Sequence, residues 1–173
     1  MLPSRLFSVS LCMLIALKPC SQSLKSDTDF SYVDSFARTV KYKNDILELT
    51  NKLTQPFPEQ ILKARAIFVW IADNIGYDYK FYNKDKQVKT PKCKQGKDCG
   101  LVFARWENKY LKKVIKKRKG VCDGYARLFN RMCEIAGLTS KIVSGYTKIK
   151  PYQIGNAGSV NHAWNVIWLD SSY

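Results

Sequence analysis

The spacing of apolar positions predicts three helices in the first two-thirds of the chain. Residues 32–53 carry a helical pattern with an expected break near residues 43–45. Residues 59–75 carry the clearest pattern, and we expect this helix to bury a continuous stripe. The stripe consists of Ile61, Ala64, Ile67, Phe68, Ile71 and Ile75, with Trp70 at its edge. Residues 106–117 form a shorter predicted helix that buries Leu111, Val114 and Ile115.

A fourth predicted helix begins at Cys122. The apolar positions that repeat along it are Ala126, Phe129, Cys133 and Ala136, and Gly137 is placed to end it. Cys122 is therefore expected in the first turn, where backbone N–H groups lack helical partners and the helix dipole is positive. Such a position favours the thiolate, which is the nucleophilic form of cysteine. The alternative is that Cys122 is a small core residue or one half of a disulfide.

Two segments near the C-terminus have the composition of β-strands. Residues 141–149 and 162–169 are rich in β-branched and aromatic side chains, and residues 151–160 between them hold the Gly, Asn and Ser of a loop. Helices followed by strands predict an α+β fold. We expect the N-terminal helices to pack on an antiparallel β-sheet.

The composition is that of one globular domain, with 173 residues of which 46% are hydrophobic. Residues 1–23 have the features of a secretory signal peptide: a short basic start, an apolar run over residues 6–17 and small residues before the predicted cleavage after Ser23. Cleavage there would leave a helical lead-in at residues 24–58 and the main domain at residues 59–173.

This signal peptide predicts a secreted protein, either periplasmic or extracellular. The apolar run is too short to span a bilayer comfortably, and no later stretch is long enough, so no transmembrane segment is expected after its removal. The alternatives are an N-terminal membrane anchor and, because Cys20 lies near the cleavage site, a lipoprotein.

The charge balance favours anionic partners. The chain holds 29 basic and 14 acidic residues, a formal net charge of +15, which suits an anionic cell-envelope surface, an acidic polymer or membrane headgroups. No signature of a nucleic-acid-binding module is present, so nucleic acid is not an expected partner. The basic run at residues 112–119 is either a solvated face or a source of positive potential that steers acidic substrates toward Cys122.

Four cysteines follow the predicted signal peptide. Cys93 and Cys99 flank a short polar stretch and are the expected disulfide. Cys122 and Cys133 lie roughly 16 Å apart along one predicted helix, too far for a bridge, so Cys122 stays free if Cys93 pairs with Cys99. The cysteine spacing and the single histidine do not favour a zinc site, and no cofactor motif or acidic calcium-ligand cluster is visible. We expect no metal and no cofactor.

His162, the single histidine, lies at the start of the second predicted strand. A cysteine at a helix start followed by a histidine on a strand is the layout of a thiol–imidazole pair. In such a pair His162 removes the proton of the Cys122 thiol, and the thiolate attacks an amide carbonyl to give an acyl-enzyme. The backbone N–H of Cys122 would stabilise the oxyanion. A histidine simply packed among aromatic side chains is the alternative.

Three segments resemble the transglutaminase-like superfamily of papain-type folds, particularly its secreted bacterial and kyphoscoliosis-peptidase-like members. They are residues 66–79, residues 118–126 around Cys122 and residues 161–165 around His162. The resemblance implies a papain/transglutaminase-like core in which Cys122 is the nucleophile and His162 is the general base. It also implies hydrolysis or transamidation of amides in protein or peptide substrates.

The family's third catalytic residue is an aspartate on the strand after the histidine strand. Asp170 falls earlier, at the turn that follows residues 162–169, so the resemblance implies that the third triad Asp is not present in this chain. It also implies an incomplete sheet at the C-terminus, a partial domain and impaired activity. Two other functions stay open: a non-catalytic transglutaminase-like module that binds cell-envelope or other anionic partners, and a small disulfide-stabilised secreted binder.

Overall fold

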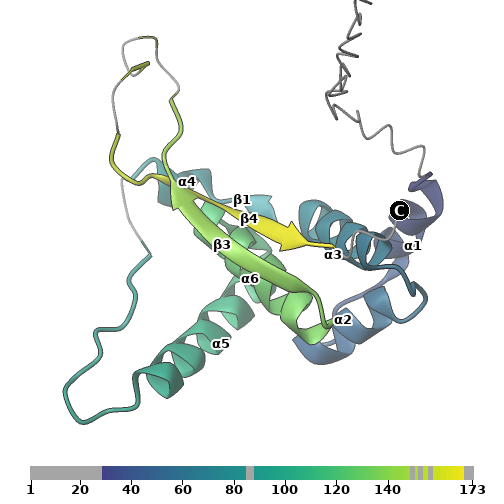
Figure 1. The fold of residues 1–173 in the computed structure, drawn as a ribbon, viewed down its shortest axis with the longest axis horizontal. Coiled ribbons are helices and arrows are strands. Elements are labelled where there is room, and N and C mark those ends of the chain that lie inside the picture. The colour runs from purple at the N-terminus through teal and green to yellow at the C-terminus, as the bar shows by residue number, and fades with distance from the viewer. Residues whose placement is uncertain (1–28, 85–87, 149–150, 152–153, 156–157, 170–173) are drawn as a thin grey trace, which may run out of the picture.

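The computed structural model describes residues 29–84, 88–148, 151, 154–155 and 158–169 (Figure 1). The helices are α1 (Ser31–Thr39), α2 (Ile46–Thr54), α3 (Gln60–Asn74), α4 (Tyr79–Tyr82), α5 (Cys99–Lys117) and α6 (Cys122–Ile135). The strands are β1 (Gly76–Tyr77), β2 (Lys119–Gly120), β3 (Thr139–Gly145) and β4 (His162–Trp168). The predicted signal peptide, Ile149 and Asp170 lie outside the described residues. None of the described helices is long and apolar enough to cross a membrane.

The first helical segment is interrupted where the sequence predicts a break. Asn44 has a positive φ of 68°, and Asp45 then caps α2 by accepting a hydrogen bond from the Leu47 backbone N–H at 2.8 Å. This break turns the chain so that both α1 and α2 pack against α3. The Arg65 guanidinium of α3 donates two hydrogen bonds, both of 2.7 Å, to the Asp34 carboxylate of α1.

The apolar stripe of α3 is buried in the core, only partly at Ile61, with one exposed exception. Trp70 is buried as well, and its indole N–H donates to the Val40 carbonyl at 3.0 Å. The exception is Phe68, which is 54% exposed, so its predicted burial is wrong. Phe68 lies at the margin of the buried face, and its ring packs 5.7 Å from the Arg65 guanidinium instead.

The centre of the fold is α6. The β3–β4 hairpin packs along it, and α2, α3 and α5 also contact it (Figure 1). Leu128, Met132 and Cys133 of α6 are fully buried. Gly137 ends the helix as predicted, with a φ of 73°, and the next N–H, that of Leu138, donates to the Cys133 carbonyl at 2.9 Å. The α+β prediction is confirmed, and α6 is the helix on which the antiparallel pair rests.

The antiparallel hairpin runs from Thr139 opposite Trp168 to Gly145 opposite His162. The second strand ends within one residue of its predicted range, whereas β3 starts two residues before the predicted 141–149 and ends at Gly145. Alternation along β4 leaves three side chains exposed, Trp164, Val166 and Trp168.

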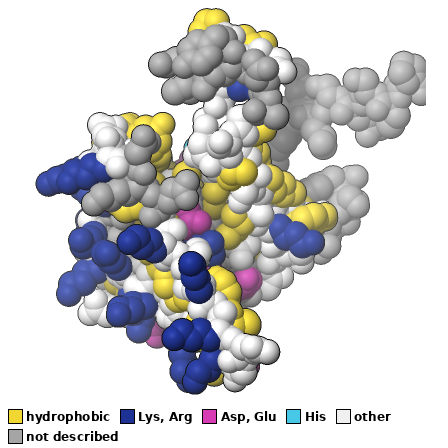
Figure 2. All heavy atoms as spheres, turned by 90° about the vertical axis from the view of Figure 1, so that its left-hand side faces the viewer, with side chains coloured by type: hydrophobic (Ala, Val, Ile, Leu, Met, Phe, Trp, Pro, Cys, Tyr) yellow, Lys and Arg dark blue, Asp and Glu magenta, His cyan; other side chains and the backbone are white. Residues whose placement is uncertain are grey.

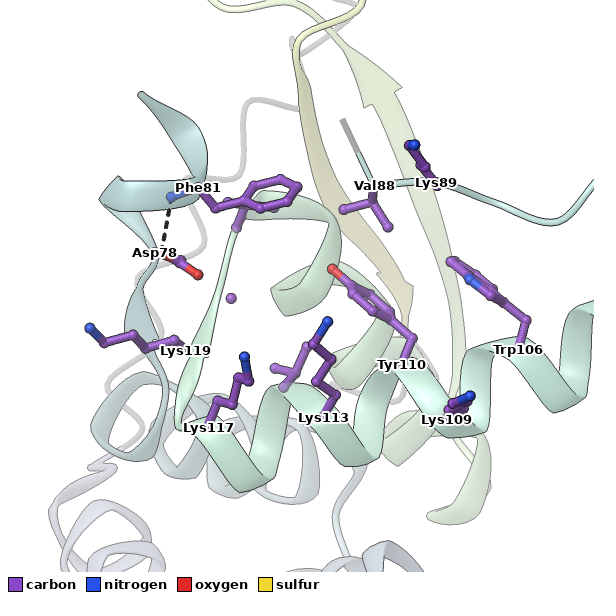
Figure 3. Close-up of a pocket in the computed structure, with 13 residues that line it drawn as sticks. Asp78, Phe81, Val88, Lys89, Trp106, Lys109, Tyr110, Lys113, Lys117 and Lys119 are labelled. Carbon is purple, nitrogen blue, oxygen red and sulfur yellow. Dashed lines mark hydrogen bonds between the residues drawn. The ribbon is translucent and has the colours of Figure 1, made fainter. Parts of the chain in front are cut away.

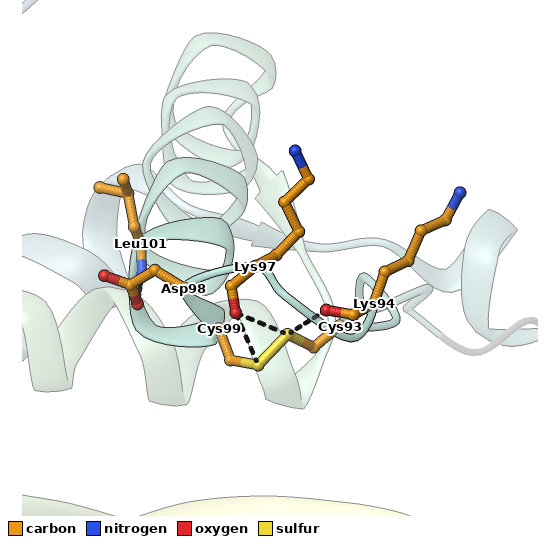
Figure 4. The surroundings of a disulfide bond; sticks show 6 residues. All are labelled: Cys93, Lys94, Lys97, Asp98, Cys99 and Leu101. Atoms are coloured by element: carbon orange, nitrogen blue, oxygen red, sulfur yellow. Dashed lines mark hydrogen bonds between the residues drawn. A yellow bond between two sulfur atoms is a disulfide. The ribbon is translucent and has the colours of Figure 1, made fainter.

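Helix α5 is longer than predicted, because it begins at Cys99 and not at residue 106. Asp98 caps it by accepting a hydrogen bond from the Leu101 N–H at 3.1 Å, and the Cys93–Cys99 disulfide closes the loop just before it (Figure 4). The first turns carry exposed apolar side chains, with Leu101 48% and Phe103 42% exposed. No inward stripe marks these turns, so periodicity does not reveal them.

A two-residue parallel pair, which the sequence does not predict, joins the end of α3 to the approach of α6. Arg118 turns the chain with a left-handed φ of 50°, and its carbonyl accepts a hydrogen bond from the Gly76 N–H at 2.9 Å. The Asp78 N–H donates to the Gly120 carbonyl, also at 2.9 Å. The side-chain hydroxyl of Tyr125 in α6 donates to the Ile75 carbonyl. These bonds hold the residues before Cys122 against the end of α3.

Candidate functional site

Cys122 is the first residue of α6. Val121 before it is extended and acts as the N-cap, and its carbonyl accepts from the Tyr125 N–H at 3.1 Å. The thiol of Cys122 is free and partly exposed. The neighbouring Tyr77 ring is partly buried, and this burial raises the pKa of its hydroxyl while a hydrogen bond from the Cys122 backbone opposes the rise. The structure thus presents a thiol at a helix start, next to a tyrosine that stays protonated.

Two glycines let the start of α6 approach α5 closely. A Cβ at Gly120 would lie 3.3 Å from a methyl group of Val114. A Cβ at Gly124 would lie 3.2 Å from the Tyr110 hydroxyl oxygen. Burial, and secondarily the nearby Asp123 carboxylate, raises the pKa of Tyr110. Small residues at both positions therefore let the Cys122 turn pack on α5.

Arg127 fixes the residue next to Cys122. Its guanidinium donates to Asp123 at 2.9 Å within α6 and to Glu107 of α5 at 3.0 Å. It also lies 5.0 Å from the centre of the Trp106 ring. This partly buried network ties the first turn of α6 to α5, so the backbone around Cys122 is held from two directions.

His162 opens β4, opposite Gly145 of β3. Its ring centre lies 5.7 Å from that of Trp164, the next residue on the same face of the strand. Trp164 in turn covers Gly145, where a Cβ would come within 2.7 Å of the indole. His162 is partly buried by these contacts.

The hydrogen bonds between α6 and the hairpin establish how Cys122 and His162 are placed. The Asn165 side chain donates to the Ala126 carbonyl at 3.0 Å. Farther along, Ser140, the β3 partner of Ile167, donates to Asn130 at 2.8 Å. From Ala126 to Asn130 the helix advances about 6 Å, and from Asn165 to Ile167 the strand advances by about the same distance. The two contacts therefore progress together along both elements, so α6 and β4 run side by side in the same direction.

Both elements therefore begin at the same end of the packed pair. Cys122 lies one helical turn before Ala126, and His162 lies three residues before Asn165. Within the described residues, no hydrogen bond or ion pair joins the Cys122 thiol to the His162 ring. The structure thus brings the two predicted residues to one end of the fold and leaves the ring packed on Trp164.

Two cavities flank this end of α6. One of about 380 Å³ lies between α3, α6 and β4 and is largely apolar; Phe68, Phe129 and Trp164 are among the residues that line it. The other, of about 700 Å³, lies between α4, α5 and the segment before Cys122. The tyrosines near the site form a cluster in which Tyr77 contacts Tyr79, Tyr82 and Tyr125 at centroid distances of 5.0, 5.8 and 6.3 Å.

Sequence reasoning assigned no role to Arg127 or Asn165. The sequence nevertheless contains a feature that points to a structural role for each of them. Asp123 and Arg127 have the i, i+4 spacing of a helical ion pair. Asn165 is a polar residue on the strand face that Ile167 shares, and a polar group there requires a hydrogen-bond partner. The Cys93–Cys99 disulfide, expected from the sequence, is present but lies in the loop before α5, away from Cys122.

Comparison with known proteins gives consistent similarities. A family model described as the transglutaminase-like superfamily matches residues 47–173. Kyphoscoliosis peptidase of Mus musculus is 32% identical over 147 residues, which cover 83% of this chain and 19% of that protein. Kyphoscoliosis peptidase of Homo sapiens is 32% identical over 161 residues, 91% of this chain and 21% of that protein. The chain thus spans about a fifth of the length of these relatives.

A solved structure titled "Crystal structure of a TGase" aligns with a TM-score of 0.45 and 18% identity, over 86% of this chain and 32% of that one.

Proposed function

This chain belongs to the transglutaminase-like superfamily, and on that premise we propose that it is a secreted enzyme that transfers acyl groups from protein or peptide amides to Cys122. The observation that carries the proposal is the alignment of α6 with β4, which sets the starts of both elements at one end. A partly exposed thiol at a helix start and an imidazole at the same end are the groups that nucleophilic catalysis needs.

The reaction begins when the imidazole of His162 accepts the proton of the Cys122 thiol and Sγ attacks the carbonyl carbon of the amide. The carbonyl oxygen becomes an oxyanion next to the backbone N–H of Cys122, a donor that has no partner within the helix and that exchanges its bond to the Tyr77 hydroxyl for one to the oxyanion. The imidazolium gives the proton to the leaving amine as the C–N bond breaks, and a thioester remains on Cys122. Water or a second amine then attacks the thioester and regenerates the thiol.

In this mechanism the His162 ring turns away from Trp164 to reach the thiol. The ring sits on the first residue of β4 and on the face of Trp164, opposite to the Asn165 face that contacts α6, so reaching the thiol requires this first residue of the strand to turn together with its ring. Catalytic hydrogen bonds are commonly long or unformed before substrate binds. We expect the substrate, by filling the space beside Trp164, to favour the orientation of His162 that faces Cys122.

We favour hydrolysis over transfer to an amine. Transfer requires that water be kept from the thioester. Cys122 is partly exposed, and a cavity of about 700 Å³ opens next to it, which supports access of water. The mammalian relatives carry the name peptidase, which agrees with a hydrolytic activity.

Secretion rests on two observations. The basic start and apolar run within residues 1–23 have the layout of a signal peptide. The Cys93–Cys99 disulfide lies in an exposed loop, where it is accessible to cellular reductants and persists best in an oxidising compartment. Expression in a bacterial host, followed by mass measurement of the exported chain, tests both the export and the cleavage after Ser23.

The enzyme proposal is tested by variants of the 173-residue chain. Amide hydrolysis is followed with labelled casein, and transfer is followed by incorporation of a dansylated amine. We expect Cys122→Ala to abolish both, and His162→Ala to slow turnover about 100-fold or more. Cys133→Ala, which removes the other free thiol of the described residues, should keep catalysis.

Full turnover by Cys122→Ala would overturn the thiol mechanism. Absence of a casein-derived acyl adduct on Cys122, in wild-type protein that binds casein, would favour the non-catalytic module instead.

A further inference from the structure

The larger cavity beside Cys122 is lined by lysines (Figure 3). Gly120 and Val121, which lead into α6, form part of its wall. Five of the described lining residues are lysines: Lys89, Lys109, Lys113, Lys117 and Lys119. Asp78 is the one carboxylate among the described lining residues, and its oxygen already accepts the Phe81 N–H at 3.0 Å. The cavity therefore has a large excess of positive charge.

The side chains of these lysines have no acidic partner among the described residues. Lys109, Lys113 and Lys117 are spaced four residues apart and lie along one face of α5. Figure 3 shows Lys113 and Lys117 rising from α5 on the side of the cavity, and Figure 2 shows basic side chains gathered over this face of the molecule. In the part of the chain that the structure describes, no salt bridge involves any of the lining lysines.

Lys109, Lys113 and Lys117 form a lysine stripe that weakens α5 in the free protein. Like charges four residues apart on a helix repel each other and destabilise it. The helix dipole favours lysine in the last turn, which accounts for Lys117 but not for Lys109 or Lys113. A negatively charged ligand between these side chains would remove the repulsion, so the stripe indicates a site for such a ligand.

Apolar and aromatic side chains line the cavity beside the lysines. They are Phe81, Val88, Trp106, Tyr110, Val114 and Val121. A nucleic acid or polyphosphate offers a continuous line of phosphates and leaves aliphatic surface without a partner. An acidic polypeptide offers carboxylates separated by apolar side chains, and it also carries the amide on which Cys122 would act.

We propose that this cavity binds an acidic segment of the polypeptide substrate, with carboxylates on the lysines of α5 and an apolar side chain against Phe81 and Trp106. The inference rests on the proposed function and names its substrate class. Because Gly120 and Val121 belong to the same wall, a segment bound here places its continuing backbone next to Cys122.

The test compares two pairs of substitutions on the same helix. Lys113→Gln/Lys117→Gln removes two charges from the cavity, and Lys112→Gln/Lys116→Gln removes two charges, at the same spacing, from positions that do not line it. A fluorescein-labelled peptide of alternating Glu and Phe is titrated with the full chain by fluorescence anisotropy. We expect the cavity pair to weaken binding about tenfold and the control pair to change it less than about twofold.

Two further probes identify the ligand. A peptide with Gln in place of every Glu should bind about tenfold more weakly to the wild-type chain. Oligothymidylate of equal charge should bind more weakly than the Glu peptide. The acidic-peptide site would be overturned if both lysine pairs lost the same affinity for the Glu peptide. It would also be overturned if the Gln peptide bound as tightly as the Glu peptide, or if oligothymidylate bound more tightly.

A last measurement separates this inference from the enzyme proposal. The Glu peptide should slow alkylation of Cys122 by iodoacetamide in the wild-type chain and in the control pair, but not in the cavity pair. This protection needs no turnover, so a chain that binds and protects but does not hydrolyse amides refutes only the proposed function. A chain that hydrolyses amides without protection by the peptide refutes only the binding site.

Discussion

The side-chain amide of Asn165 in β4 donates a hydrogen bond to the backbone carbonyl of Ala126 in α6, with 3.0 Å between the two atoms. This bond links the strand that starts at His162 to the helix that starts at Cys122. Because the Ala126 carbonyl also serves its own helix, the contact depends on the second lone pair of that oxygen. Among the described residues, it is the side-chain hydrogen bond that joins β4 directly to α6.

Asn165→Ala should lower the free energy of unfolding by about 1 kcal/mol, because one partly buried hydrogen bond is lost. It should also slow iodoacetamide alkylation of Cys122 toward the rate of His162→Ala, since the strand start is no longer fixed against the helix start. Urea unfolding and peptide mass spectrometry measure the two effects. Asn130→Ala removes the bond to Ser140 at the far end of α6 and serves as the control. An equal effect of Asn130→Ala on the alkylation rate would argue against this role of Asn165.

The two free thiols of the described chain should differ sharply in reactivity. Cys133 is fully buried, and that burial raises its thiol pKa to about 11, partly offset by a hydrogen bond with Ser140. At about pH 7 it should stay unlabelled in the folded protein, because both access and thiolate are lacking. Cys122 should be labelled first, and urea should make both react. Labelling of native Cys133 as fast as Cys122 would contradict the observed packing.

Stability should depend on pH through Asp34. Hydrogen bonds from Arg65 hold the pKa of the Asp34 carboxyl below its usual value. A lowered pKa in the folded state stabilises the fold above the unfolded pKa of about 4, and this stabilisation is lost as the pH falls below it. Asp34→Asn should therefore lower the free energy of unfolding by about 1 kcal/mol at neutral pH and have less effect at acidic pH.

A more exposed ion pair between the same helices provides the matched control. Arg38 donates to Asp73 at 2.8 Å, but both side chains are largely solvated. Asp73→Asn should change stability by less than about 0.5 kcal/mol at any pH. If Asp34→Asn and Asp73→Asn lowered the free energy of unfolding equally, the two hydrogen bonds between Arg65 and Asp34 would stabilise the fold no more than the exposed ion pair does.

Gly137 should resist substitution by residues that avoid a left-handed backbone. Its φ is 73°, and a Cβ there would meet no other atom, so conformation and not space is the constraint. Gly137→Ala should lower the free energy of unfolding by about 1 kcal/mol. Gly137→Asn should be milder, because asparagine tolerates this region. Differential scanning calorimetry of the two variants distinguishes the causes. A conformational effect makes Gly137→Ala less stable than Gly137→Asn, whereas a simple loss of glycine destabilises both variants equally.

Three elements could be read from the sequence because burial imposes a period on them. The helices α3 and α6 and the strand β4 each bury one face against the core, and their predicted bounds lie within one residue of the observed ones. The break before α2 was readable because Asn44 and Asp45 favour a left-handed turn and an N-cap respectively.

Other features carried no periodic signal. The parallel pair of β1 and β2 has two residues in each strand, and its bonds join residues 76 and 118, distant in the chain. The first turns of α5 contain no buried side chain and rely on the Asp98 cap and the disulfide. The basic run at residues 112–119 was visible, but that some of its lysines line a cavity follows from α4 and residues 88–89 closing over α5.

The short pairing of β1 with β2 makes the Cys122 thiol part of the same cooperative unit as the N-terminal helices. Gly76 and Asp78, at the end of α3, hold the backbone just ahead of Cys122 through two hydrogen bonds. Any sub-global opening that detaches α3 must release those bonds and free the first turn of α6. Hydrogen exchange at the amide of Gly76 should therefore rise and fall together with that at the amides of α3, so that an opening event far from Cys122 changes the backbone next to it.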